Sequence, residues 1–383
     1  MAVAVSGALF LTGAARAEAA SSGRDDTAAA VRTALGTSTL GGDGTGIDIA
    51  LLDTGVMTVP GVPADHVLYG PDFTLDALNP NFRGLDDFGH GTNMASLVLD
   101  AAPGARIVSV KVGSASSPAT LAGILGGIDW TVKNAHTEGR NIRVINVSFG
   151  LTPDSDGGLV AAALRKAWAA GIVVVAAAGN QGNTASRLDA PANDNLLIAV
   201  GAESMAPETA APFSSGASAF LARVPDLLAP GVGLVGARVP GSFLDVSYPE
   251  ARVGDDGFRG SGTSQAAALT SGAIADLLQR RPDLGPDQVK YLLTGTAKPL
   301  AGVPNFVQGK GAVNPARAGS TPTPTRAWAV LSNGSLLQAL RLPTLAQLLT
   351  PLSGVIWNGD PWNGNRWSGN RWSGNRWSGD HWE

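Results

Sequence analysis

The chain has 383 residues, 44% of them hydrophobic and only 15% charged, so it can bury a large core. Its net charge of −4, with no basic patch along the sequence, argues against a nucleic-acid partner. Because the chain contains no cysteine, disulfide bonds, a thiolate nucleophile and cysteine-ligated zinc are excluded.

The N-terminus begins with an apolar run of about signal-peptide length, which is too short to span a bilayer as a helix. Ala15-Arg16-Ala17 and Ala17-Glu18-Ala19 both fit a small-x-small cleavage site, although no Lys or Arg precedes the run. We therefore expect residues 1–20 to be a signal peptide, residues 21–43 to be a short linker, and the protein to be secreted and extracellular. The alternative is an Ala-rich leader without an export role. No stretch is long and apolar enough for a transmembrane helix.

From residue 44 to residue 318, apolar runs of strand length alternate with segments of helical spacing. The predicted strands are residues 47–52, 107–112, 144–149, 172–177 and 196–200. The predicted helices are residues 90–101, 121–135, 159–170, 264–279 and 286–294. This alternation predicts a three-layer α/β/α fold with a mostly parallel central sheet, whose site should lie at the carboxyl ends of the strands.

Four short segments at the ends of these elements carry polar residues suited to catalysis. They are Asp53-Thr54-Gly55, Gly89-His90-Gly91-Thr92, Ala177-Ala178-Gly179-Asn180 and Gly262-Thr263-Ser264-Gln265. Each alone is a common turn or helix cap. Together they supply an acid, a base, an amide donor and a hydroxyl nucleophile, which is the set that acyl transfer through a serine requires.

Taken together, these segments resemble the subtilase (subtilisin-like serine protease) family, in which the order is Asp, His, Asn and Ser. The resemblance runs from about Gly44 to about Ala318. It implies that Asp53, His90 and Ser264 form a catalytic triad and that Asn180 donates to the oxyanion with the Ser264 N–H. It also implies that the substrate is bound by the segments Ser148-Phe149-Gly150 and Ala178-Gly179.

The chain departs from the usual family pattern at three positions, none of which removes a catalytic atom. Ala268 stands where Pro is usual, Ser96 where Gly is usual, and Asn93 where His is frequent. The small residues of Ala177-Ala178-Gly179 suggest a roomy apolar pocket and a preference for large hydrophobic side chains. The family often carries structural calcium, so the resemblance implies that a calcium ion can be bound, but no complete ligand set can be read from the sequence and we predict no metal residues. No cofactor is expected for the chemistry.

The C-terminal part differs in composition from the rest. Residues 319–356 combine a Pro/Thr linker with a short apolar helix, and residues 357–383 carry a Trp at every fifth position. A period of five fits neither a helix nor a strand, so this tail is either a flexible low-complexity extension or a multivalent tail whose Trp rings stack on sugars.

These patterns predict a secreted, monomeric serine endopeptidase that hydrolyses polypeptides through an acyl-enzyme intermediate. One alternative is a catalytically weak subtilase scaffold that binds a cell surface or polysaccharide through its Trp-rich tail. Another is a peptide ligase, because the same acyl-enzyme can react with an amine instead of water.

Overall fold

The computed structural model describes residues 23–37, 41–116, 119–151, 157–218 and 222–323. The predicted signal peptide, the Trp-rich tail and most of the predicted 319–356 linker lie outside the described residues.

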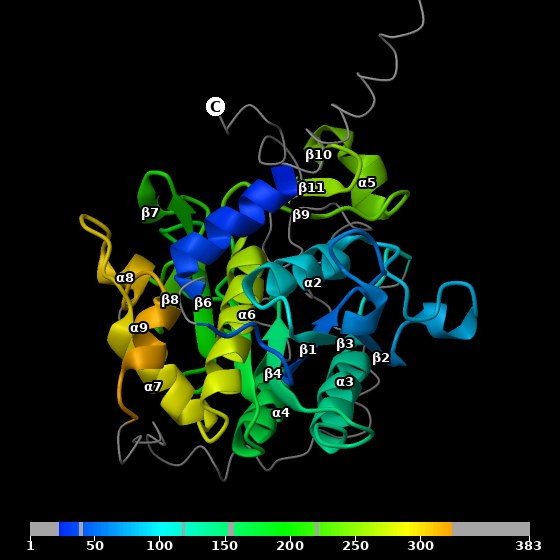
Figure 1. The fold of residues 1–383 in the computed structure, drawn as a ribbon, viewed down its shortest axis with the longest axis horizontal. Helices are drawn as coiled ribbons and strands as arrows, with labels where there is room; N and C mark the ends of the chain where they lie inside the picture. Colours follow the sequence, from blue (N-terminus) through cyan, green and yellow to red (C-terminus); the bar gives the residue numbers. More distant parts are fainter. Residues whose placement is uncertain (1–22, 38–40, 117–118, 152–156, 219–221, 324–383) are drawn as a thin grey trace, which may run out of the picture.

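A mostly parallel sheet forms the middle of the molecule (Figure 1). Its strands are β1 (Asp48–Asp53), β2 (Val67–Asp72), β3 (Arg106–Lys111), β4 (Ile142–Val147), β5 (Val173–Ala177), β6 (Ile198–Met205), β7 (Glu208–Ala210) and β8 (Leu227–Pro230). The order is β2-β3-β1-β4-β5-β6-β7, with β8 also paired to β6, and only β7 runs antiparallel to its neighbour. Every residue of β1 and β5 is buried, because helices cover both faces of a parallel sheet.

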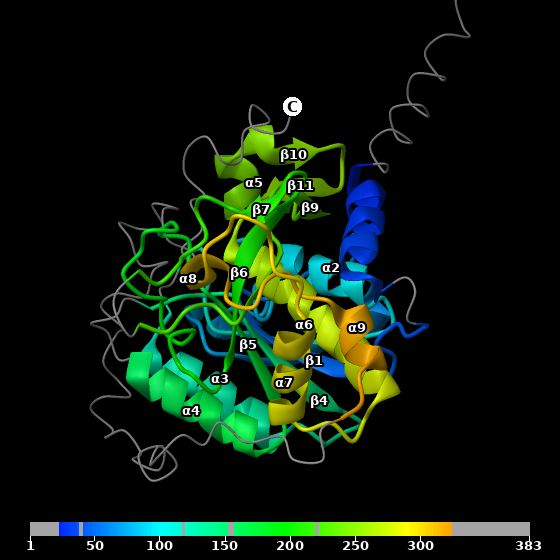
Figure 2. The same cartoon turned by 90° about the vertical axis from the view of Figure 1, so that its left-hand side faces the viewer.

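The helices form layers on the two faces of this sheet (Figure 2). One face carries α2 (His90–Ala101) and α6 (Thr263–Arg280), and the other carries α3 (Leu121–Lys133) and α4 (Gly157–Ala169). The remaining helices are α5 (Phe243–Ser247), α7 (Pro286–Thr296), α8 (Asn305–Gln308) and α9 (Pro315–Ser320), with short 3-10 turns η2 (Ala64–His66), η3 (Leu75–Leu78) and η4 (Pro249–Ala251). The predicted three-layer α/β/α architecture is confirmed.

Helix α6 is the most enclosed element of this fold. All of its residues from Thr263 to Leu278 are buried, which explains a composition rich in Ala, Ser and Gly rather than an amphipathic stripe. It approaches α2 so closely that a Cβ added at Gly272 would lie 2.5 Å from the carbonyl oxygen of Val98. The two helices that begin at His90 and Thr263 are therefore held in direct backbone contact.

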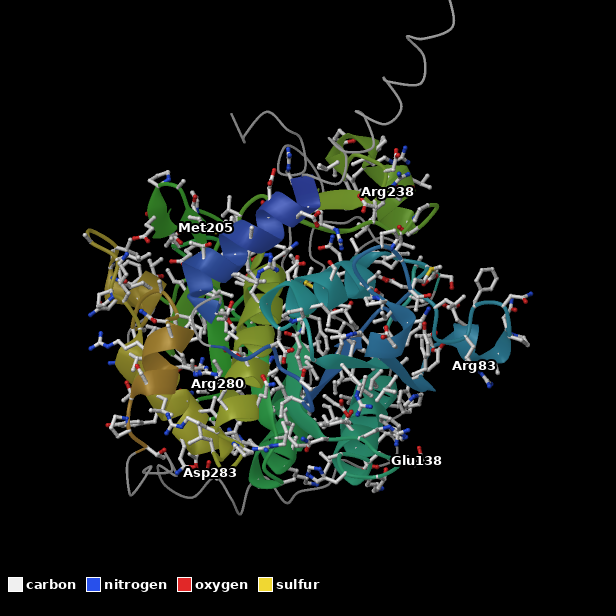
Figure 3. The ribbon with its side chains drawn as sticks, in the orientation of Figure 1. Arg83, Glu138, Met205, Arg238, Arg280 and Asp283 are labelled. Carbon is white, nitrogen blue, oxygen red and sulfur yellow. The ribbon has the colours of Figure 1, made fainter. Side chains whose placement is uncertain are left out.

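A small antiparallel sheet lies beside the N-terminal part of α2. It consists of β9 (Leu234–Ala237), β10 (Arg252–Val253) and β11 (Gly257–Gly260), in the order β10-β11-β9. Arg238, which is labelled in Figure 3, and Arg252 both donate to Asp245 of α5, at 2.5 and 2.7 Å. Burial acts to raise the pKa of Asp245. Hydrogen bonds from Arg238, from the Gly241 N–H and from Arg252 outweigh burial and lower this pKa to about 2.

Two of the residues that depart from the family pattern connect α2 to this small sheet. The Asn93 amide donates to the carbonyl oxygens of Ala237 and Phe258, at 3.2 and 3.1 Å. The Ser96 hydroxyl accepts from the Ala237 N–H at 2.7 Å and donates to the Asn93 carbonyl at 2.7 Å. Asn93 and Ser96 thus have a structural explanation within this chain.

The N-terminal segment that was predicted as a linker contains a helix, residues 23–35, drawn in dark blue in Figure 1. Val31 and Leu35 are buried, and Arg32 Nη1 donates to the carbonyl oxygen of Asp100 at the end of α2. A Cβ added at Gly23 would lie 2.7 Å from Val253 of the small sheet. None of the described helices has the length and apolar character needed to cross a membrane.

Candidate active site

Three neighbouring strands end side by side at one edge of the central sheet. β1 and β4 are paired as far as Leu52 and Val147, so the next residues, Asp53 and Ser148, lie next to each other. β5 pairs with the other side of β4 and leads directly into residues 178–180. The carboxyl ends of β1, β4 and β5 therefore gather the candidate acid, a substrate-binding segment and the candidate amide donor.

Asp53 and His90 form a buried hydrogen-bonded pair at this edge. His90 Nδ1 lies 2.8 Å from Asp53 Oδ1, and the two side chains are at most 1% exposed. Burial raises the pKa of Asp53. The electrostatic interaction with His90 and the hydrogen bonds from His90 and from the Thr54 N–H oppose this rise. With Asp53 ionised, Nδ1 is the donor of this bond, so Nε2 is the ring nitrogen that accepts a further proton.

Asp86 organises the chain around this pair and was missed in the sequence. Its carboxylate, fully buried, accepts four hydrogen bonds: Oδ1 accepts from Thr54 Oγ1 and the Gly89 N–H, both at 2.7 Å, and Oδ2 accepts from the Thr92 N–H and Oγ1, at 2.8 and 2.7 Å. Asp86 therefore caps the N-terminus of α2 and connects it to the segment after β1. An Asp three residues before a Gly-His helix start is the signal that could have revealed it.

The start of α2 requires glycine before His90. Gly89 has φ = 101°, in the left-handed region, where a side chain is strained. A Cβ at this position would also lie 2.6 Å from the Ser242 hydroxyl. Gly89 thus allows the sharp entry that makes His90 the first residue of α2.

Ser264 is the second residue of α6 and is tied to the end of β4 by a reciprocal pair of hydrogen bonds. Its Oγ donates to the Ser148 carbonyl oxygen at 3.0 Å, and Ser148 Oγ donates to the Ser264 carbonyl oxygen at 3.2 Å. Ser148 Oγ in turn accepts from the Asn146 amide at 2.7 Å. Ser264 lies in the first turn of α6, so the backbone N–H groups of this turn and the positive end of the helix dipole are directed towards the same edge of the sheet.

Asn180 is held by the residue that precedes Ser264. Its Oδ1 accepts from the Thr263 N–H at 3.0 Å, and the adjacent Gly179 N–H donates to Thr263 Oγ1 at 3.2 Å. Gly179 has φ = 106°, a left-handed conformation that suits glycine. The acceptor half of the Asn180 amide thus faces α6, which fixes the amide plane and leaves Nδ2 as its donor half.

The remaining candidate substrate-binding residues lie on either side of this region. Phe149 and Gly150 continue from Ser148, and the next residue, Leu151, exchanges two backbone hydrogen bonds with Ala190. Ala178 accepts from the Asp189 N–H at 3.3 Å. The loop before Pro191 is therefore connected to both candidate segments.

Within the described residues, no group of three or more His or acidic side chains is arranged to hold a metal ion. The other histidine with a described side-chain contact, His66, lies away from these groups and contacts the Ala105 carbonyl through Nδ1 at 2.7 Å.

Comparison with known proteins identifies the family. The subtilase family model matches residues 44–312. The chain belongs to the subtilase family. The resemblance predicted from the four motifs is thereby confirmed, and so is the assignment of the fold.

Individual relatives support the same assignment. This subtilase is 35% identical over 296 residues to the serine protease AprX of Bacillus subtilis (strain 168), a match covering 71% of this chain and 65% of AprX. It is 30% identical over 286 residues to subtilisin DY of Bacillus licheniformis, covering 71% of this chain and 90% of that protein. The chain thus spans about two thirds of the length of AprX.

Solved structures show the same fold. Fervidolysin from Fervidobacterium pennivorans, described as a keratinolytic enzyme related to subtilisin, has a TM-score of 0.60 and 26% identity, covering 76% of this chain and 46% of its own. MycP1 with its N-terminal propeptide removed has a TM-score of 0.58 and 25% identity, covering 77% of this chain and 98% of its own.

Proposed function

We propose that this subtilase is a serine endopeptidase in which Asp53, His90 and Ser264 form the catalytic triad. The observation that carries the proposal is the buried Asp53–His90 hydrogen bond of 2.8 Å at the end of β1. β1 is paired with β4, and Ser148, which follows β4, accepts a hydrogen bond from Ser264. An ionised carboxylate on Nδ1 orients the imidazole and stabilises its protonated form, which is what a serine nucleophile needs from its base.

Acylation begins when the Ser264 hydroxyl hydrogen turns from the Ser148 carbonyl to Nε2 of His90. Nε2 accepts this proton while Ser264 Oγ bonds to the carbonyl carbon of the scissile peptide. The imidazolium then donates the same proton to the leaving amine as the carbon–nitrogen bond breaks. A water molecule, deprotonated by His90, hydrolyses the resulting ester and restores Ser264.

The oxyanion formed during both steps is stabilised by two donors. They are Nδ2 of Asn180, whose amide plane is fixed by the Thr263 N–H, and the backbone N–H of Ser264. The N-terminus of α6 adds a favourable dipole at the same place. Subtilisin is itself the reference case for the cost of removing such an Asn, about 10²–10³-fold in kcat.

The substrate is proposed to lie between the segments Ser148-Phe149-Gly150 and Ala178-Gly179. Extended peptides commonly bind by adding a strand to an exposed backbone edge, so these segments would contact the residue that precedes the cleaved bond. No cofactor takes part in this chemistry.

The test compares cleavage of unfolded casein by the wild type, Ser264→Ala and the control Ser186→Ala, which removes an exposed hydroxyl in the loop after Asn180. We expect the control to keep wild-type activity and Ser264→Ala to lose at least ~10³-fold, because the nucleophile is absent. Equal activity in Ser264→Ala and the wild type would refute the triad.

We further propose that the enzyme works outside the cell, as the apolar N-terminal run and its small-x-small sites suggest. Binding of the Trp-rich tail to carbohydrate and a monomeric state remain predictions from the sequence. Retention of residues 357–383 on a polysaccharide resin, compared with a Trp→Ala version, would test the tail directly.

A further inference from the structure

Lys111 is a fully buried lysine at the end of β3. Its Nζ donates to Asp76 Oδ2 at 2.7 Å, to the Leu85 carbonyl oxygen at 2.5 Å and to Asp87 Oδ1 at 3.1 Å. Three hydrogen bonds are all that an ammonium group can donate. All three acceptors belong to the loop between β2 and α2, and α2 is the helix that begins at His90.

The Lys111 side chain carries its positive charge in this buried place. Burial acts to lower the pKa of Lys111, but Asp87 and Asp76 outweigh burial and raise it. Burial raises the pKa of Asp87 to about 6, and Lys111 opposes this rise, so Asp87 is mainly ionised at neutral pH. A buried ion pair loses far more than a surface pair when one partner is removed. The position of the loop therefore depends on this ammonium group.

Lys111 is also the residue of β3 that stands opposite Asp53. The two Cα positions are paired in the parallel register of β1 and β3. The next residue, Val112, donates its N–H to the Asp53 carbonyl oxygen at 2.8 Å. The Lys111 ammonium thus joins the strand beside the candidate acid to the loop that leads to the candidate base.

The loop is fixed by this ammonium at two points close to the candidate site. The Leu85 carbonyl oxygen is 2.8 Å from the position that a Cβ on Gly55 would occupy, and Gly55 is the second residue after Asp53. The other point, Asp87, follows directly after Asp86, whose carboxylate caps the start of α2. A shift at either point would move the first turn of α2.

We propose that Lys111 is a positioning residue for His90. Its ammonium group fixes the loop at Leu85 and Asp87, so that the first turn of α2 presents the imidazole to the nucleophile. The hydrogen bonds of this group all go to the loop, so its removal should act on the chemical step more than on substrate binding. A misplacement of about 1 Å at a catalytic group can cost about 10²-fold in rate.

This inference rests on the proposed endopeptidase function and is tested first by kinetics on a peptide taken from the casein cleavage products. In Lys111→Ala we expect kcat to fall by ~10–100-fold, with KM changed by less than ~3-fold. The rate at which a fluorophosphonate labels Ser264 should fall by a similar factor, because labelling needs the same base. Lys133→Ala, which removes an exposed lysine of α3, is the control and should change neither rate.

Alkylammonium ions give a readout that a loss of stability alone would not give. Lys111→Ala removes three carbons and the ammonium group and keeps Asp76, Asp87 and the Leu85 carbonyl. Propylammonium has the size of the removed part, so it should bind there and raise the kcat of Lys111→Ala by ~5-fold or more, without effect on the wild type. Tetramethylammonium, a cation that cannot donate a hydrogen bond, should not restore activity.

Lys111→Met keeps the test decisive if Lys111→Ala does not fold. Methionine fills the space with an unbranched apolar side chain, so this variant should show the same fall in kcat and no response to propylammonium.

The outcomes separate this inference from the function on which it rests. A wild-type kcat in the folded Lys111 variants would overturn the positioning role alone. A fall in kcat that propylammonium does not reverse in Lys111→Ala would do the same, and so would a loss seen only in KM. Equal cleavage by the wild type and Ser264→Ala would overturn the endopeptidase function, and the role of Lys111 with it.

Discussion

Asp86 supports the geometry of the Asp53–His90 pair through hydrogen bonds to the two segments that carry these side chains. It is connected to the residue after His90 through Thr54, whose Oγ1 donates to Asp86 and accepts from the Gly91 N–H at 2.9 Å. A positioning residue of this kind acts on the orientation of His90 and not on the substrate. Its replacement should therefore change kcat more than KM.

We expect Asp86→Asn to lower the free energy of unfolding by about 3 kcal/mol, because an amide replaces one acceptor oxygen with a donor that faces other donors. We also expect kcat to fall by ~10–100-fold with KM nearly unchanged, since small misplacements of a catalytic group are costly. Urea unfolding in a Ser264→Ala background, which prevents self-cleavage, and steady-state kinetics would measure these effects. The control Asp65→Asn, at an exposed site, should change neither, and a wild-type kcat in Asp86→Asn would contradict the positioning role.

The residues of the candidate site could be found in the sequence where they belong to short contiguous motifs. Asp53, His90, Asn180 and Ser264 each follow a strand or open a helix, so local patterns reveal them. Asp86 does not stand out in this way, because Thr54, one of its hydrogen-bond partners, lies 32 residues away in the sequence.

At the scale of elements, the long periodic segments were predicted well and the short ones were not. Helix α2 was predicted with its observed bounds, and β1, β3, β4 and β5 were placed within two residues at each end. β6 extends five residues beyond the predicted end at residue 200. β2, which contains Gly and Pro, and the two- to four-residue strands β7 to β11 were not predicted. Strands this short carry too few residues for a periodic pattern and depend on contacts made elsewhere.

The close packing of α2 against α6 leaves no room for a side chain at Gly272. A Cβ at Gly272 would lie 2.5 Å from the Val98 carbonyl and 2.8 Å from Ala101 Cβ, so Gly272→Ala must push the helices apart. The helix propensity of Ala contributes up to ~1 kcal/mol, but overpacking costs about 1–3 kcal/mol, so we expect net destabilisation. Activity should fall as well, because these helices begin at His90 and Thr263.

Gly295 of α7 is the matched control for this change. It is exposed, and nothing lies within 4 Å of the Cβ that Ala would add. Gly295→Ala should therefore leave stability unchanged or raise it by less than ~1 kcal/mol. Chemical denaturation of both variants would decide the matter, and an equal effect of the two substitutions would show that α2 and α6 are not in close contact.

At the scale of the whole molecule, the edge that carries the candidate site is supported from several sides. Asn93 and Ser96 connect α2 to the small sheet, and the helix of residues 23–35 lies beside α2 (Figure 1), with Arg32 bonded to the Asp100 carbonyl near the end of α2. The sequence showed Asn93 and Ser96 only as departures from a family pattern. Their partners lie in β9 and β11, and the position of these two strands beside α2 could not be predicted from the local sequence.

Stability of the whole protein should also depend on Glu203 of β6, a buried residue whose Oε2 has no hydrogen-bond partner among the described residues. Burial, with the nearby Glu208, raises the pKa of Glu203 to about 7, while Lys298 opposes the rise. Since the folded state binds this proton more tightly than the unfolded state, stability decreases as the pH rises from about 4.5 to about 7.

Glu203→Gln should remove this dependence. We expect it to change the free energy of unfolding little at pH 4.5 and to raise it by up to about 3 kcal/mol at pH 8.5, relative to the parent protein. Urea unfolding at the two pH values in the Ser264→Ala background provides the measurement. Glu208→Gln, at an exposed ion pair with Lys298, should show no comparable difference, and an identical effect of Glu203→Gln at both pH values would argue against the buried proton.

Activation of Ser264 by His90 and Asp53 can be measured by covalent labelling. After treatment with a fluorophosphonate, intact-mass spectrometry gives the number of adducts and peptide mapping gives their position. We expect one adduct per chain, located on Ser264, and labelling at least ~10²-fold slower in His90→Ala because the base is absent. An adduct on another residue, or equally fast labelling of Ser264 in His90→Ala, would show that Ser264 is not a nucleophile activated by His90.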